Sequence, residues 1–204
     1  GKTIGDETLL ELIAQARKDD SIKAVILRVD SPGGSALASD IMWHAIGKLA
    51  EEKPVVASMV DVAASGGFYI SMGLPIVAET ATLTGSIGVV TAKLALGQLY
   101  RKIGFAKETL SRGRYAELLS DSRSFTTDEA SYFRDGAERA YKSFVSKAAA
   151  SRGVSFEKMD EVAQGRVWTG LQGSEQGLVD HLGGFWKAVE LAKEKAGIDA
   201  GDYI

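Results

Sequence analysis

The sequence predicts an α/β protein with a mostly parallel sheet and flanking helices. Short apolar runs rich in β-branched residues alternate with segments of helical periodicity, and this alternation implies right-handed crossovers between parallel strands. The runs occupy residues 24–29, 55–60 and 75–78. Each run leads into a turn rich in glycine and serine. Since reactive groups gather at the carboxyl ends of parallel strands, the turns at 31–35, 63–67 and 84–88 are expected to converge.

The other elements follow from helical spacing and from cap residues. Apolar residues at helical spacing follow Asp6, which we take as an N-cap. The stretch Thr126 to Glu129 has the form of a capping box and opens a long amphipathic helix. Further helices are expected after the first glycine turn through residue 49, over 92–103, after Ser155 and over 185–195, with two short strands at 165–170 and 177–180.

Composition excludes several classes of protein. The chain has 204 residues and a net charge of −3 with scattered basic residues, so there is no electrostatic footprint for nucleic acid. It has no cysteine and only two histidines, so we expect no disulfide, no metal site and no cofactor. No apolar run approaches the roughly 18 residues that span a bilayer, so we expect a soluble piece. We also expect this piece to be excised from a longer chain.

Ser65 is the strongest candidate for chemistry. It follows a predicted strand and lies among Ala63, Ala64, Gly66 and Gly67. Small neighbours let a substrate backbone approach the hydroxyl, and a helix that begins at Gly66 would point free N–H groups at the same place. A nucleophile beside oxyanion donors is what acyl transfer requires. A helix N-cap serine beside a tight turn has the same pattern, and this motif alone leaves both interpretations open.

The turn at residues 31–34 is a second candidate. Its sequence S-P-G-G places two glycines at a strand end, where backbone N–H groups can face a cleft. A P-loop requires a lysine and a serine or threonine at fixed spacing, which are missing after Gly34. A dinucleotide-binding G-x-G-x-x-G is missing as well. A bare P-G-G is common in turns, so the motif gains meaning only with its neighbours.

The motifs taken together resemble the signal peptide peptidase A (protease IV) family. A strand, a P-G-G turn and a helix come first, and a second strand, an A-S-G-G turn and a helix follow about 30 residues later. The T-G-S-I-G turn comes next. Two further motifs extend the resemblance, G-R-V-W-T-G at 165–170 and G-L-V-D-H-L-G-G at 177–184. The resemblance implies the crotonase/Clp-protease-like fold, with a helical C-terminal arm, and a serine/lysine peptidase. By position it implies Ser65 as nucleophile, the N–H groups of Gly34 and Gly66 as oxyanion hole, and Ser86 as the serine that orients the lysine.

The family's lysine base is missing from this chain. In single-domain members it follows the T-G-S motif by about 30 residues in a stretch of the form S-G-K-Y-K. The matching stretch here begins at Ser111 and places Ala116 at the lysine position. Long members carry two tandem halves, the lysine in the first and the serine in the second. The chain therefore resembles the C-terminal half of a long form, and the base is expected from the missing N-terminal half or from a neighbouring subunit.

Local bases are poor substitutes. His44 lies on a predicted helix and His181 near the C-terminus, with no sign that either reaches Ser65 as a triad requires. A lysine base must be buried to be neutral near pH 7. The lysines after the T-G-S-I-G turn, Lys93, Lys102 and Lys107, stand in amphipathic or polar contexts.

The resemblance implies a serine endopeptidase that degrades cleaved signal peptides and other hydrophobic peptides. It implies one peptidase domain over 1–204, with a core to about 125 and a helical arm and C-terminal segment over 126–204. It also implies a homo-oligomeric ring, associated with a bacterial inner membrane and facing outward, or with a plastid thylakoid. Two alternatives stay open: a crotonase-type acyl-CoA enzyme, for which Glu79 and Asp61 are poorly placed carboxylates, and a non-catalytic scaffold half.

Overall fold

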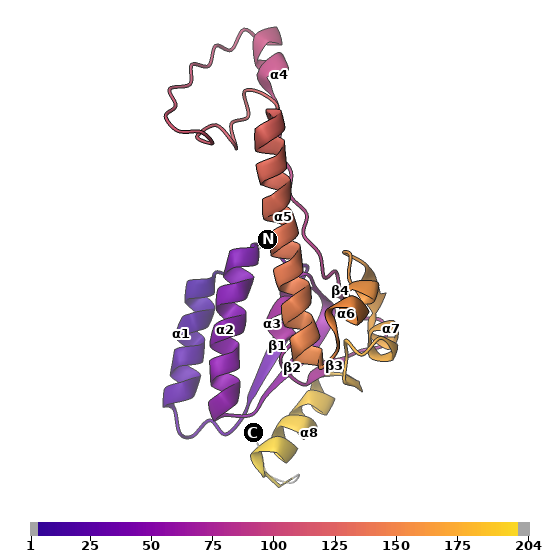
Figure 1. Cartoon of the computed structure of the whole chain (residues 1–204). Coiled ribbons are helices and arrows are strands. Elements are labelled where there is room, and N and C mark those ends of the chain that lie inside the picture. The colour runs from indigo at the N-terminus through magenta and orange to yellow at the C-terminus, as the bar shows by residue number, and fades with distance from the viewer. Residues whose placement is uncertain (1–3, 200–204) are drawn as a thin grey trace. The chain divides into compact units, whose positions relative to one another are not determined.

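Strand β2 (Val55–Ala64) lies at the centre of a six-stranded sheet in the part of the chain that the structure, a computed structural model, describes, residues 4–199 (Figure 1). It pairs in parallel with β1 (Val25–Ser31) and, at its two ends, with β3 (Ile76–Ala78) and β4 (Leu83–Gly85). Strand β6 (His181–Leu182) continues the parallel order beside β3, whereas β5 (Val167–Thr169) is antiparallel to β4. The predicted α/β class with a mostly parallel sheet is confirmed.

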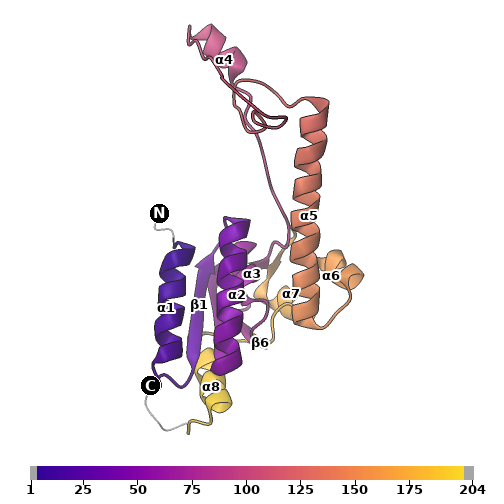
Figure 2. The ribbon, with the colours of Figure 1, turned by 60° about the vertical axis from the view of Figure 1, so that its left-hand side comes forward.

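Up to β3, helices alternate with the strands, as the periodicity indicates, and three helices follow one another after β4. The helices are α1 (Asp6–Lys18), α2 (Ala36–Glu52), α3 (Gly66–Ser71), α4 (Gly97–Lys102), α5 (Thr127–Arg152), α6 (Phe156–Val162), α7 (Gly170–Glu175) and α8 (Phe185–Ala196). The first two helices lie side by side in both views (Figures 1 and 2). No helix within residues 4–199 has the length and apolar character to cross a membrane.

The chain divides into two compact units. Unit 1 comprises the residues up to 88 and those from 143 onward, and it contains the whole sheet; unit 2 comprises residues 89–142. The interior of unit 1 is apolar because β2 and β3 are buried on both faces, as parallel strands require. On one side, Ala188 and Ala192 of α8 pack against Val56 and Val77. Other fully buried side chains are Met59, Phe68, Met72, Ile76, Ile87 and Leu178.

Cap residues decide where several helices begin. Ser35 caps α2 by accepting a hydrogen bond from the amide of Ala38 at 3.2 Å. The predicted capping box of α5 is confirmed. The Thr126 hydroxyl accepts from the Glu129 amide at 3.2 Å, and the Glu129 carboxylate accepts from the Thr126 amide at 2.8 Å. These bonds satisfy amides that the helix itself leaves without partners.

Two of the predicted elements are placed differently. The helix expected over 92–103 forms only as α4: the Leu96 amide donates to the Asp121 carbonyl at 2.7 Å instead of to a helical acceptor, and residues 92–96 lie outside any helix or strand. The strand expected at 177–180 is wrong. Those residues fold back on α7, where the Leu178 amide donates to the Gly173 carbonyl at 2.7 Å, and β6 forms one residue later.

The N-cap of α1 is also corrected. Gly5, in an extended conformation, is the N-cap, and Asp6 is the first helical residue. A carboxylate in the first turn still interacts favourably with the helix dipole, which accounts for an acidic residue there.

Candidate active site

Ser65 occupies the single residue between β2 and α3. Its backbone has φ 52° and ψ −113°, a region that side-chain-bearing residues rarely adopt. Such strain costs of order 1–3 kcal/mol and is typical of functional turns. The residue stands at the N-cap position of α3, but its hydroxyl makes no capping hydrogen bond. Ser65 therefore has the position of an N-cap residue, but its half-buried side chain does not stabilise the helix by capping it.

The P-G-G turn contacts the Ser65 turn directly. Gly33 has φ +98°, and a Cβ atom added to it would lie 2.6 Å from the Gly66 nitrogen and 3.0 Å from Ser65 Oγ. A Cβ atom on Gly66 would lie 3.3 Å from the Gly34 nitrogen. Only glycine at 33 allows this approach of two backbones. The structure thus brings Gly34 and Gly66 together beside the hydroxyl of Ser65.

Neither glycine of the proposed oxyanion pair is buried. Gly34 is exposed and Gly66 is half-buried. The Gly66 N–H is the first amide of α3, and first-turn amides have no acceptor within their own helix. An oxyanion hole requires two such donors converging on the atom next to a nucleophile. The geometry of the two turns is compatible with that chemistry.

Ser86 lies one strand away from Ser65. The Ser65 amide donates to the Gly85 carbonyl at 2.9 Å, which extends the β2–β4 pairing by one residue. Ser86 itself has φ 50°, and its amide donates to the Arg166 carbonyl at 2.7 Å. The T-G-S-I-G turn is therefore held beside the Ser65 turn by β4 and by the G-R-V-W-T-G motif that contains β5.

The two histidines lie on separate elements of unit 1. His44 is exposed on α2, and His181 lies in β6, where it pairs with Val77 of β3. The candidate carboxylates for the acyl-CoA alternative are both exposed. Glu79 Oε1 lies against Gly184, 2.4 Å from where a Cβ atom would stand, and Asp61 is on β2.

Unit 2 holds the lysines that follow the T-G-S-I-G turn. Lys107 forms an ion pair with Asp121, and the hydrogen bond to that carboxylate raises the pKa of Lys107. The Lys93 ammonium is enclosed and lies 4.4 Å from the centre of the Phe125 ring, a cation–π contact. Lys102 is an exposed residue of α4.

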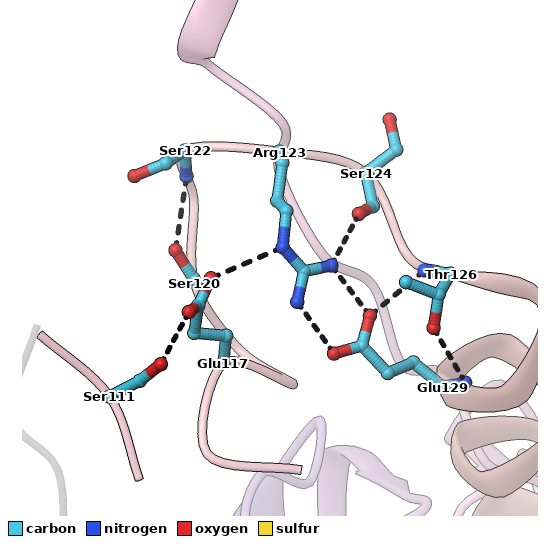
Figure 3. A network of polar contacts seen from close by, with 8 residues as sticks. All are labelled: Ser111, Glu117, Ser120, Ser122, Arg123, Ser124, Thr126 and Glu129. Carbon is cyan, nitrogen blue, oxygen red and sulfur yellow. Dashed lines mark hydrogen bonds and ion pairs between the residues drawn. The ribbon is translucent and has the colours of Figure 1, made fainter. Parts of the chain in front are cut away.

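Ala116, at the family's lysine position, is exposed in unit 2. Ser111 and Glu117, which flank it in the sequence, belong to a polar network (Figure 3). The Ser111 hydroxyl donates to Glu117 at 2.6 Å, and Arg123 Nε donates to the same carboxylate at 3.2 Å. The other two guanidinium nitrogens each donate to Glu129, which is buried, at 2.7 Å. Arg123 thereby joins the loop around Ala116 to the start of α5.

One cluster near the turn escaped sequence reasoning. Lys147 of α5 forms an ion pair with Asp40 of α2, and both bind the hydroxyl of Tyr69 on α3. The residues are 29 to 107 positions apart along the chain, so no local pattern links them. Tyr69 lies four residues after Ser65, and that spacing was the one available signal.

The fold and the glycine-lined serine turn define an α/β protein of the Clp protease type. A ClpP1 mutant from Listeria monocytogenes has the same fold, with a TM-score of 0.60 at 12% identity over 90% of this chain and 86% of that one. The model of peptidase family S49 matches residues 47–199. The chain belongs to peptidase family S49.

Named relatives agree with this assignment. The chain is 56% identical to the chloroplastic serine protease SPPA of Arabidopsis thaliana over 97% of its length, and 38% identical to Protease 4 of Salmonella typhi over 94%. It spans only 30% and 32% of the length of those two proteins. The resemblance to the signal peptide peptidase A family and the Clp-protease-like fold are therefore confirmed, and with them the class of serine peptidase domain.

Proposed function

We propose that the protein containing this chain is a serine endopeptidase that degrades cleaved signal peptides and other hydrophobic peptides. The observation that carries the proposal is the direct contact between the Gly33–Gly34 turn and the Ser65–Gly66 turn. That contact brings the Ser65 hydroxyl close to the backbone of Gly34 and Gly66, which supports a site in which one hydroxyl and two amides act on a single carbonyl group. The relatives named as proteases support the reaction class, and their greater length supports a site completed by further chain.

In the proposed reaction a lysine outside this chain removes the proton from Ser65 Oγ, which attacks the scissile carbonyl. The C=O π electrons move to oxygen, and the N–H groups of Gly34 and Gly66 stabilise the resulting oxyanion. The tetrahedral intermediate then collapses, the amine leaves with the proton held by the lysine, and a serine ester remains. Water, deprotonated by the same lysine, hydrolyses that ester and regenerates Ser65.

Ser86 is proposed to orient the lysine, since its turn is held beside Ser65 by the bond between the Ser65 amide and the Gly85 carbonyl. Ala116 cannot accept a proton, so the base is assigned to the N-terminal half of a longer chain or to a neighbouring subunit. Association with a bacterial inner membrane or a thylakoid, and assembly into a homo-oligomeric ring, belong to the same proposal. The chloroplastic and bacterial relatives support those two locations.

The test is reactivity of the full-length protein with a fluorophosphonate probe, together with hydrolysis of a synthetic signal peptide. Wild type is expected to be labelled at Ser65, and S65A to lose both labelling and hydrolysis. S155A is the matched control, because Ser155 is also an N-cap serine, with a structural bond to the Lys158 amide at 3.3 Å. It is expected to lose about 1 kcal/mol of stability and to keep its labelling.

Two outcomes would overturn the proposal. A wild-type protein that stays unlabelled while it binds a CoA thioester would favour the acyl-CoA alternative. Undiminished peptide hydrolysis by S65A would remove Ser65 from the reaction.

A further inference from the structure

Three charged or polar side chains meet behind the serine turn, each from a different helix of unit 1. The Tyr69 hydroxyl of α3 donates to Asp40 Oδ1 of α2 at 2.7 Å. The Lys147 ammonium of α5 donates to the same carboxylate oxygen and, at 3.1 Å, to the Tyr69 hydroxyl oxygen. The three groups therefore form a closed set of hydrogen bonds, in which each group contacts the other two.

Aromatic rings enclose the cation of this cluster. The Lys147 ammonium lies 5.0 Å from the centre of the Trp43 ring and 5.6 Å from that of Tyr69. The Tyr69 ring, buried, packs on Phe144 with centroids 4.5 Å apart and meets Trp43 edge-on at 6.1 Å. Cation–π contacts of this kind strengthen when water is excluded. The ammonium is thus fixed between two helices.

The charges of the pair are maintained at neutral pH. Burial alone would lower the pKa of Lys147, but the hydrogen bonds to Asp40 and Tyr69 outweigh it and raise the pKa. Burial alone would likewise raise the pKa of Asp40, and the bonds from Lys147 and Tyr69 lower it instead. Lys147 is therefore held as a cation, which suits a structural contact and not a general base.

Two of the three helices that the cluster joins, α2 and α3, carry the two turns of the site. Helix α2 begins directly after Gly34 and the cap residue Ser35, and Asp40 lies in its second turn. Helix α3 begins directly after Ser65, and the Tyr69 amide donates to the Ser65 carbonyl at 2.8 Å. A displacement of α3 along α2 would change the separation of the two turns.

A second contact shows that α2 packs closely against the turn that contains Gly66. Ser39, the neighbour of Asp40, is buried and its hydroxyl donates to the Ser35 carbonyl at 2.9 Å. That hydroxyl lies against Gly66, since a Cβ atom on Gly66 would be 2.6 Å away from it. The second turn of α2 is therefore the surface on which the Gly66 backbone rests.

We propose that Asp40, Tyr69 and Lys147 are positioning residues for the peptidase reaction, which set the distance between the Gly34 and Gly66 amides by fastening α3 to α2. The inference rests on the proposed function, because it assumes that those amides bind the oxyanion. None of the three side chains touches the reacting atoms. Their contribution is to the transition state, where the oxyanion forms, and not to the binding of the peptide.

Y69F in the full-length enzyme is the sharpest test, since it removes the hydroxyl and keeps the ring. We expect kcat for a synthetic signal peptide to fall by about 10- to 100-fold, with KM changed by less than about two-fold. The rate of fluorophosphonate labelling should fall in parallel. K147M is expected to behave like Y69F, and K147R, which keeps the charge, to recover part of the loss.

E52Q is the matched control. It removes a carboxylate from the other end of α2, where Glu52 pairs with Arg17 of α1. We expect its melting temperature to change by less than that of Y69F, because the Glu52 pair is exposed whereas the contacts of the Tyr69 hydroxyl are part-buried. Its kcat and labelling rate are expected to equal those of wild type.

The outcomes separate the two proposals. Wild type and E52Q that neither react with the probe nor hydrolyse peptide contradict the proposed function itself. If wild type is active and Y69F has the same kcat and labelling rate, only the positioning role is overturned, even if the melting temperature of Y69F is lower. If Y69F does not fold, K147M and K147R decide, and equal kcat in K147M and wild type overturns the inference.

Discussion

Gly33 lies so close to Ser65 that a methyl group in place of its hydrogen would stand 2.7 Å from Ser65 Cβ. No flexible side chain separates the two, and Gly33 has φ +98°. The Ser65 turn and the P-G-G turn therefore meet through the Gly66 backbone and the short side chain of Ser65. Any group larger than hydrogen at this point must move one turn away from the other.

G33A is accordingly expected to reduce peptide hydrolysis and fluorophosphonate labelling by about 100-fold or more, because it separates the turns. The positive φ adds a cost of about 1–2 kcal/mol in stability. G47A is the control, since Gly47 of α2 has no atom within 4 Å of its Cβ position. It should gain about 0.5–1 kcal/mol and keep its activity. Normal labelling of G33A would contradict the close packing of the two turns.

The backbone conformation of Ser65 is expected to lower the stability of the fold. With φ 52° and ψ −113°, its backbone suits glycine better than any residue with a side chain. S65G should therefore unfold with a free energy about 1 kcal/mol above that of S65A, although both lack the nucleophile. Denaturant unfolding of the two variants makes the comparison. Equal stabilities would mean that the turn relaxes and holds no strain.

The isolated chain of residues 1–204 is expected to be inactive. It contains Ser65 and both glycine turns, but Ala116 stands at the position of the family's base. Labelling and signal-peptide hydrolysis, measured beside the full-length protein, are expected to be at background, while circular dichroism and cooperative thermal unfolding show that the chain is folded. Hydrolysis within about ten-fold of the full-length rate would show that a base lies within these residues.

The network of unit 2 predicts an acid-sensitive loop. The hydrogen bonds from Arg123, and then that from the Thr126 amide, lower the pKa of Glu129 from 4.5 to about 2. A lowered pKa means that the stabilisation is complete above pH 4.5 and is lost as the pH falls through about 2. The hydrogen-exchange protection factors of residues 111–130, each the intrinsic exchange rate divided by the observed rate at the same pH, should therefore fall over this range in wild type.

E129Q provides the comparison, because its amide does not titrate. Its protection factors at neutral pH should already be lower than those of wild type, and they should change less as the pH falls from 4.5 to 2. Carbon NMR of the Glu129 carboxyl gives the pKa directly. Titration at the ordinary value near 4.3 would contradict the ion pair with Arg123.

The sequence predicted most of the sheet because buried parallel strands have a distinctive composition. The runs that became β1, β2 and β3 are continuous and β-branched, and the glycine turns after them indicate where side chains gather. The contact between Gly33 and Ser65 followed from that rule, since neighbouring parallel strands end at the same edge. The capping box at Thr126 could also be predicted from the sequence, because Thr126 and Glu129 lie within one helical turn.

The sequence failed where a contact between distant residues decides the conformation. The first part of the expected helix 92–103 is not helical, since the Leu96 amide bonds to the Asp121 carbonyl, a contact that no helical periodicity reveals. Residues 177–179 look like a strand, but Gly177 and the bond from Leu178 to Gly173 turn them back. The set of Asp40, Tyr69 and Lys147 was missed for the same reason.

The antiparallel pairing of β4 with β5 also bears on the order in which the protein is made. The Ser86 turn is held by the carbonyl of Arg166, some 80 residues later in the chain. When Gly34, Ser65 and Ser86 have been synthesised, the strand that holds the Ser86 turn has therefore not yet been made. A nascent chain thus carries the Ser65 hydroxyl well before β5 is available to hold the Ser86 turn beside it.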